Sequence, residues 1–145
     1  MAFYYGKCVL VTGASSGLGA AAAAALAEKG YIVWGVSRHC SREDQIIGKG
    51  MIHFLPMDVT DETQIQQVVQ EICTKAGPVG IVVHCAGYGI GGAAEDTPAG
   101  EVLNLIKTDY LGVLNVNRAV LPEMRRRGGG LVIVTGSVAG LTSIP

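Results

Sequence analysis

Three short stretches of this sequence combine residue types that could do chemistry. The first is Thr12–Gly19, TGASSGLG, in which glycines and small hydroxyl residues follow an apolar run. The second is the pair Ser37-Arg38, and the third is Ser137 in the stretch LVIVTGSVAG. Bare backbone N–H groups at a helix start bind phosphate, and a guanidinium binds phosphate through two parallel hydrogen bonds. The sequence therefore predicts an anion-binding site beside a serine that could orient a substrate.

The elements that must position these residues alternate between strand and helix. Strands are expected in five apolar runs: Cys8–Val11, Tyr31–Val36, Met51–Met57, Val79–His84 and Leu131–Thr135. Strands separated by helices form right-handed crossovers and a parallel sheet, so the candidate residues meet at its carboxyl edge. We expect an α/β fold: one Rossmann-like, doubly wound parallel sheet domain over residues 1–145.

Three helices are expected between these strands. Gly17–Lys29 is rich in alanine and ends at Gly30, and Thr60-Asp61-Glu62 opens a second helix. A long third helix ends at Arg125–Arg127, where cations complement the helix dipole. The polar stretch 38–50 is ambiguous, and we interpret it as one poor helix.

Composition excludes some partners and gives no metal site. The net charge of −1 offers no electrostatic reason to bind nucleic acid or an anionic membrane. The four cysteines form no CxxC pair and have no ligand spacing with the three histidines, so we expect free structural thiols, no metal and a reducing cytoplasm. The N-terminal apolar run ends at Val11, far short of a membrane span, and no signal peptide is visible.

The glycine loop has the chemistry that a dinucleotide pyrophosphate needs. Gly13 and Gly17 open the turn, and Gly19 lets the helix pack closely on the strand. The spacing is GxxxGxG rather than the commoner GxGxxG. A turn that only links strand to helix is the alternative, and the placement between a strand and a helix disfavours it. The predicted phosphate-binding residues are Gly13, Ser15, Ser16, Gly17, Leu18 and Gly19.

TGASSGLG resembles the signature of the short-chain dehydrogenase/reductase family. Three further stretches match the family's pattern in order. Asp58-Val59 stands where the family places an acid against the cofactor adenine, and His84–Gly87 stands where it has Asn-Asn-Ala-Gly. Thr135–Ser137 stands where it carries its active-site serine. The similarity runs through essentially all 145 residues.

The resemblance implies a nicotinamide cofactor lying against Ala86 and Gly87. The residue at the end of the second strand determines whether NAD or NADP is preferred. An acid there would bind the ribose hydroxyls of NAD and repel the 2′-phosphate of NADP. This chain has Ser37-Arg38 instead. A charge-assisted bond to phosphate contributes about 1.5–3 kcal/mol. We expect a preference for NADP(H); NAD(H) stays open, as does a plain surface role for Arg38.

The resemblance also implies hydride transfer between the nicotinamide and a carbonyl or secondary alcohol. Ser137 would orient the substrate oxygen, with an ordinary turn serine as the alternative. The family's relay asparagine falls at Asp109, which can accept a hydrogen bond but cannot donate one unless protonated. Its role stays open. His84 is expected to be structural, holding the fourth strand against its neighbour.

The resemblance implies a tyrosine about a dozen residues after Ser137 and a lysine one helical turn after that tyrosine. Both positions lie past Pro145, the last residue of this sequence. We therefore expect an N-terminal portion of a longer chain, with later strands and helices missing and no activity by itself. The intact protein is expected to act on a small carbonyl or alcohol and to form a homo-oligomer. The alternatives are a non-catalytic dinucleotide sensor, and an epimerase or dehydratase that retains its cofactor.

Overall fold

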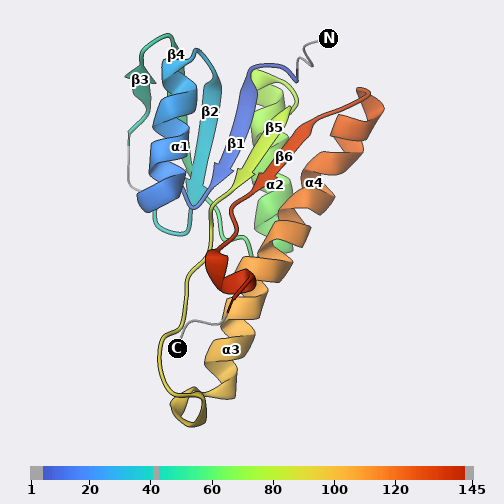
Figure 1. Cartoon of the computed structure of the whole chain (residues 1–145). Coiled ribbons are helices and arrows are strands. Elements are labelled where there is room, and N and C mark those ends of the chain that lie inside the picture. The colour runs from blue at the N-terminus through green and yellow to red at the C-terminus, as the bar shows by residue number, and fades with distance from the viewer. Residues whose placement is uncertain (1–4, 41–42, 143–145) are drawn as a thin grey trace.

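The computed structural model describes residues 5–40 and 43–142, which form a sheet with helices on both faces (Figure 1). The strands are β1 Cys8–Thr12, β2 Ile32–Ser37, β3 Gln45–Ile47, β4 Gly50–Pro56, β5 Ile81–His84 and β6 Leu131–Val134. The α-helices are α1 Gly17–Glu28, α2 Glu62–Ala76, α3 Ala99–Leu105 and α4 Gly112–Arg126.

The strand order is β3-β4-β2-β1-β5-β6, and every pairing is parallel except that between β3 and β4. This confirms the predicted doubly wound, Rossmann-like sheet, with the five predicted strands in parallel. Their carboxyl ends all point to the lower edge of the sheet in Figure 1. In open α/β sheets ligands bind at this edge.

The prediction of a helix within 38–50 is wrong over the described part of that stretch; residues 41 and 42 lie outside the description. Here β3 forms an antiparallel hairpin with β4, in which Ile47 pairs with Gly50. Gly48 begins the two-residue turn at φ +58°, a conformation that glycine adopts without strain. A Cβ on Gly50 would overlap the carbonyl oxygen of Tyr31. Tertiary packing therefore overrides the weak preference of this stretch for a helix.

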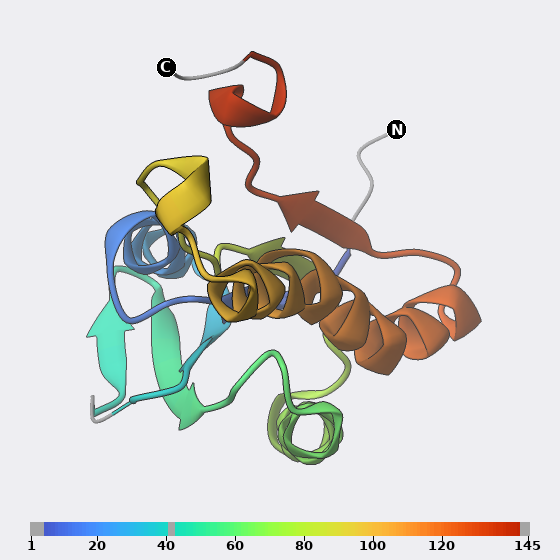
Figure 2. The same ribbon diagram turned by 90° about the horizontal axis from the view of Figure 1, so that it is seen from below.

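Alternate residues of β1 face opposite layers of the molecule. Cys8 and Leu10 are buried against α2 and α4, whereas Val9 and Val11 are buried against α1. Figure 2 shows α1 and α2 on opposite sides of the sheet. Both faces of the central strand are thus removed from water, which explains its unbroken apolar run.

The second helix forms as its sequence predicts. Asp61 is its N-cap, and the carboxylate accepts a hydrogen bond from the backbone N–H of Gln64 at 2.9 Å. The residues at i, i+3, i+4 and i+7 spacing are all buried. They are Ile65, Val68, Val69 and Ile72.

The predicted third helix is one column with an interruption. Ile106–Leu111 is π-helical and joins α3 to α4, and α3 extends beyond the carboxyl edge of the sheet (Figure 1). Gly112 lets α4 approach the end of β4, because a Cβ there would lie 2.7 Å from Cγ2 of Val59. Such single wide turns are frequent at functional sites, and this one carries Asp109.

Candidate functional site

The glycine loop joins β1 to α1 through close backbone contacts. Gly13 has φ +69°, and a Cβ on it would lie 2.7 Å from the carbonyl oxygen of Cys85 and the nitrogen of Ala86. A Cβ on Gly19 would overlap the carbonyl oxygen of Gly13. Ser16 is the N-cap of α1, and its side chain makes no capping bond to the first-turn N–H groups. These donors face the carboxyl edge, where an anion would complement them.

Thr12 connects this loop to the end of β5. Its buried hydroxyl oxygen accepts hydrogen bonds from the backbone N–H groups of Cys85 and Ala86, both at 3.2 Å. The hydroxyl holds the ends of β1 and β5 in register below Gly13. Sequence reasoning placed Thr12 in the motif but gave it no function, because nothing local shows that its partners lie on another strand.

A hollow of about 390 Å³ runs along these strand ends. All twelve residues predicted to bind a cofactor line it, from the glycine loop, the ends of β2 and β4, and the turn after β5. They are Gly13, Ser15, Ser16, Gly17, Leu18, Gly19, Ser37, Arg38, Asp58, Val59, Ala86 and Gly87. Sequence reasoning missed a further set in the same lining, which is Val36, His39, Met57, Cys85, Tyr88 and Thr108. The structure therefore brings the predicted cofactor residues into one groove.

Hydrogen bonds fix the acid at the end of β4. Asp58 Oδ1 accepts bonds from the N–H and the hydroxyl of Thr60, both at 2.8 Å. The backbone N–H of Asp58 donates to Oε1 of Gln64 at 2.6 Å. Arg38, across the groove, is exposed and forms no ion pair within residues 5–40 and 43–142. Its guanidinium is therefore available to an anion.

Ser137 and Asp109 line a second hollow, of about 490 Å³, beside β6. The Ser137 hydroxyl oxygen accepts a bond from the N–H of Ala139 at 3.1 Å, and within residues 5–40 and 43–142 its O–H has no acceptor. Tyr88 and Gly87 line both this hollow and the groove. The two predicted catalytic residues therefore share a space that adjoins the cofactor groove.

Asp109 contacts the loop after β5 from the π-helical stretch. Its Oδ1 accepts a hydrogen bond from the backbone N–H of Tyr88 at 3.2 Å. A Cβ on Gly87 would lie 3.3 Å from the carboxylate, so glycine leaves room for this contact. The contact needs only an acceptor, which an ionised aspartate supplies as well as an asparagine. This departure from the family's asparagine is therefore compatible with an ordered site.

His84 is buried at the end of β5, as expected of a structural residue, and its ring forms a hydrogen bond with α4. The Nε2–H donates to Oδ1 of Asn117 on α4 at 3.0 Å. The backbone carbonyl of His84 accepts bonds from the N–H and hydroxyl of Thr135 in the chain just beyond β6. The expected strand contact is thus made by the backbone, while the side chain connects the sheet to α4.

Three side chains among the described residues have shifted pKa values. Burial lowers the pKa of the His84 imidazole, and the hydrogen bond to Asn117 opposes this shift. Burial raises the pKa of the Cys8 thiol to about 12. It also raises the pKa of Cys85, opposed by a hydrogen bond with Thr135. The cysteines are free, as predicted, and no cluster of metal ligands occurs among the described residues.

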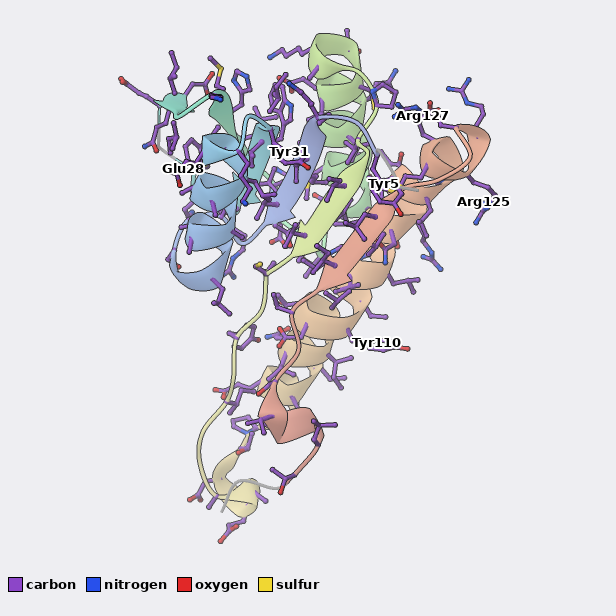
Figure 3. The ribbon with its side chains drawn as sticks, turned by 45° about the horizontal axis from the view of Figure 1, so that its top comes forward. Tyr5, Glu28, Tyr31, Tyr110, Arg125 and Arg127 are labelled. Carbon is purple, nitrogen blue, oxygen red and sulfur yellow. The ribbon has the colours of Figure 1, made fainter. Side chains whose placement is uncertain are left out.

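Three of the described tyrosines, Tyr5, Tyr31 and Tyr110, do not line the Ser137 hollow. Figure 3 shows Tyr5 and Tyr31 at the amino end of the sheet, opposite the site, while Tyr110 projects outward from the helical column. Tyr110 is 72% exposed. Tyr88 lines the Ser137 hollow, but Gly92 stands four residues later where a lysine would be needed. No Tyr/Lys pair of the family type therefore occurs in the described part of the chain.

Comparison with known proteins decides the family. Residues 7–145 match the profile of the family described as short chain dehydrogenase. The chain belongs to this family. A 3-ketodihydrosphingosine reductase of Bacteroides thetaiotaomicron is 40% identical over 139 residues, which are 96% of this chain and 50% of that protein. An uncharacterized oxidoreductase of Bacillus subtilis, YusZ, is 34% identical over 96% of this chain and 51% of its own length.

Solved structures confirm the fold, and one of them is a short-chain dehydrogenase by its description. This one, from Streptomyces avermitilis, has a TM-score of 0.86 at 35% identity, covering 94% of this chain and 51% of that one. ElxO with NADP bound has a TM-score of 0.87 at 27% identity, and the match covers 96% of this chain and 58% of ElxO. The chain therefore spans about half the length of the relatives that it matches. Within the described residues, no helix is long and apolar enough to cross a membrane.

Replacing Gly19 tests the close packing of the loop. Gly19→Ala places a methyl group against the backbone of Gly13, and we expect a loss of about 1–3 kcal/mol in the free energy of unfolding. Gly89→Ala is the matched control, since a Cβ at Gly89 meets nothing within 4 Å. Urea unfolding measures both. Equal stabilities of the two variants would contradict the packing argument.

The buried imidazole predicts how stability depends on pH. Because folding lowers the pKa of His84, its stabilising contribution is fully present above the ordinary value of 6.5. It is lost as the pH falls from 6.5 through the folded-state pKa, by at most about 1.4 kcal/mol per pH unit. In urea titrations between pH 8 and pH 5, His84→Gln should show a shallower loss than wild type. His39→Gln, at an exposed site, should keep the wild-type slope, and an unchanged slope in His84→Gln would refute this source of the dependence.

Proposed function

We propose that this chain is the cofactor-binding part of an NADP(H)-dependent oxidoreductase. Such an enzyme moves hydride between nicotinamide and a carbonyl or secondary alcohol. The observation that carries the proposal is the single groove lined by all twelve predicted cofactor residues, which adjoins the hollow of Ser137. The relatives that bear functional names include reductases, and the named substrate of one is a 3-keto compound.

The residues of the groove fit a dinucleotide. Gly13 and Gly19 keep side chains out of the loop, so a pyrophosphate can approach the N–H groups at the start of α1. Asp58, held by Thr60, would accept a bond from the adenine amino group. Ala86 and Gly87 leave room beside the nicotinamide end. When bound, the cofactor supplies the hydride donor or acceptor.

Arg38 supports the choice of NADP(H). An arginine follows β2 where an NAD-binding relative would need an acid for the ribose hydroxyls. Its exposed guanidinium has no ion-pair partner within the described residues, so it is available to bind a 2′-phosphate. ElxO, of similar fold, has been solved with NADP and with NADPH.

In the second hollow, the Ser137 hydroxyl would donate a hydrogen bond to the substrate oxygen. This bond strengthens as negative charge grows on that oxygen during hydride transfer. Asp109 would act indirectly, because its bond to the Tyr88 N–H fixes the loop that separates groove and hollow. Because the Asp109 carboxylate makes the acceptor contact that an asparagine could make, an aspartate at this position is compatible with an enzyme as well as with a non-catalytic sensor.

The intact protein is proposed to be a homo-oligomer. The outer side of the helical column exposes a row of large apolar side chains that a second subunit could cover. They are Val102, Leu103, Ile106, Tyr110, Leu111 and Leu114.

Activity of the intact protein tests the reaction. We expect oxidation of NADPH that depends on an added ketone, with 3-ketodihydrosphingosine as the first substrate tried. Ser137→Ala should lower kcat by roughly 10²–10³-fold, because it removes one donor to the developing oxyanion. NADPH affinity should be unchanged in this variant. Thr142→Ala is the matched control, because Thr142 lies on the same segment and does not line the hollow. Tight NADPH binding without turnover of any ketone would favour the sensor, and cofactor retained through purification would favour an epimerase or dehydratase.

Binding measurements test the cofactor preference. We expect wild-type protein to bind NADPH about ten- to a hundred-fold more tightly than NADH, and Arg38→Ala to remove most of this difference. The arginine contacts only the 2′-phosphate in this account, so NADH affinity should stay the same. Equal affinities for the two cofactors, unaltered in Arg38→Ala, would refute the preference.

A further inference from the structure

A third hollow, of about 480 Å³, adjoins the cofactor groove at the ends of β2 and β4. It shares four lining residues with the groove: Arg38, Asp58, Tyr88 and Thr108. The residues that it adds are all polar, namely Thr60, Asn104 and Lys107. The two spaces are therefore continuous, and a group bound at the end of the groove could extend into this polar hollow.

The charges around this hollow favour an anion. Arg38 and Lys107 are its two cations, and Asp58 is the one acid in its lining. That carboxylate already accepts two bonds from Thr60. Neither cation forms an ion pair in the described part of the chain. The lining thus carries one net positive charge and two cationic groups without a carboxylate partner.

Lys107 lies in the π-helical stretch and lines the polar hollow. Three consecutive residues of that stretch line the three hollows: Lys107 the polar hollow, Thr108 the polar hollow and the groove, and Asp109 the Ser137 hollow. Arg38 approaches from the opposite side, after β2. The two cations therefore come from separate elements that converge on one space.

We propose that Lys107 is a second cation for the adenosine 2′-phosphate and, with Arg38, selects NADP(H) over NAD(H). This inference rests on the proposed function. A phosphate monoester carries a charge of about −1.5 to −2 at pH 7, more than one guanidinium neutralises, and Asp58 adds a further negative charge nearby. Arg38 supplies directional, bidentate bonds, whereas the Lys107 ammonium acts as a mobile point charge.

Dissociation constants of the intact protein for NADPH and NADH test this role. We expect Lys107→Gln to weaken NADPH binding about three- to ten-fold and to leave NADH binding unchanged, since an exposed ammonium contributes modestly. The slope of NADPH affinity against salt concentration should also become shallower. Glutamine keeps a long side chain with similar helix propensity, so folding should be preserved.

Lys29→Gln is the matched control, because Lys29 lines none of these hollows. Lys29 follows Glu28, which Figure 3 labels at the far end of α1. This variant should bind both cofactors as wild type does. A double variant with Arg38→Gln should bind NADPH and NADH with nearly equal affinity.

The outcomes separate this inference from the proposed function. If wild type prefers NADPH through Arg38 while Lys107→Gln changes nothing, the role of Lys107 is refuted and the proposed function stands. An equal loss for NADPH and NADH in Lys107→Gln also refutes it, because the effect would not involve the 2′-phosphate. If wild-type protein binds neither cofactor, the proposed function itself fails, and this inference with it.

Discussion

Two backbone segments that are 73 residues apart in the sequence meet at the end of β1, and the rest of the site depends on their contact. The Thr12 hydroxyl accepts the N–H groups of Cys85 and Ala86, while Gly13 lies so close to the same residues that a Cβ has no room. This contact fixes the floor of the groove. It also fixes where the β5 loop leaves the sheet, and hence the boundary between groove and Ser137 hollow.

The helical column supplies the opposite wall. Asp109 accepts a bond from the N–H of Tyr88, and His84 binds Asn117 further along the column, in α4. The two contacts join the end of β5 and the turn after it to the same column. The loop between groove and hollow is therefore held from below by Thr12 and from the side by the column. A site with polar groups fixed on two rigid elements suits a reaction that needs aligned cofactor and substrate.

Much of this arrangement could be predicted from the sequence, because local patterns determine it. The apolar runs and their glycine turns predicted the parallel strands, and Asp61 predicted the start of α2. Motifs at strand ends predicted twelve of the residues that line the groove, since parallel strands place their carboxyl ends together. The β3 hairpin escaped prediction because Gly48 and Gly50 act through contacts with α1 and Tyr31.

The contacts of Thr12, His84 and Lys107 could not be predicted from the sequence for a related reason. Each depends on a partner or a space supplied by a distant element: the β5 end for Thr12, Asn117 for His84, and the Arg38 side of the polar hollow for Lys107. The π-helical turn that carries Lys107 and Asp109 has no signal in the periodicity of the sequence. Only the folded chain shows which polar residues share a space.

The central claim is that the glycine loop binds the pyrophosphate of NADP(H) and Arg38 binds the 2′-phosphate on the adenosine of the same molecule. A crystal structure of the intact protein grown with NADP⁺ tests this most directly. The account predicts the pyrophosphate against the backbone N–H groups at the start of α1, and the 2′-phosphate within hydrogen-bond distance of the Arg38 guanidinium. A groove that stays empty at saturating NADP⁺, or a dinucleotide bound with its 2′-phosphate away from Arg38, would contradict it.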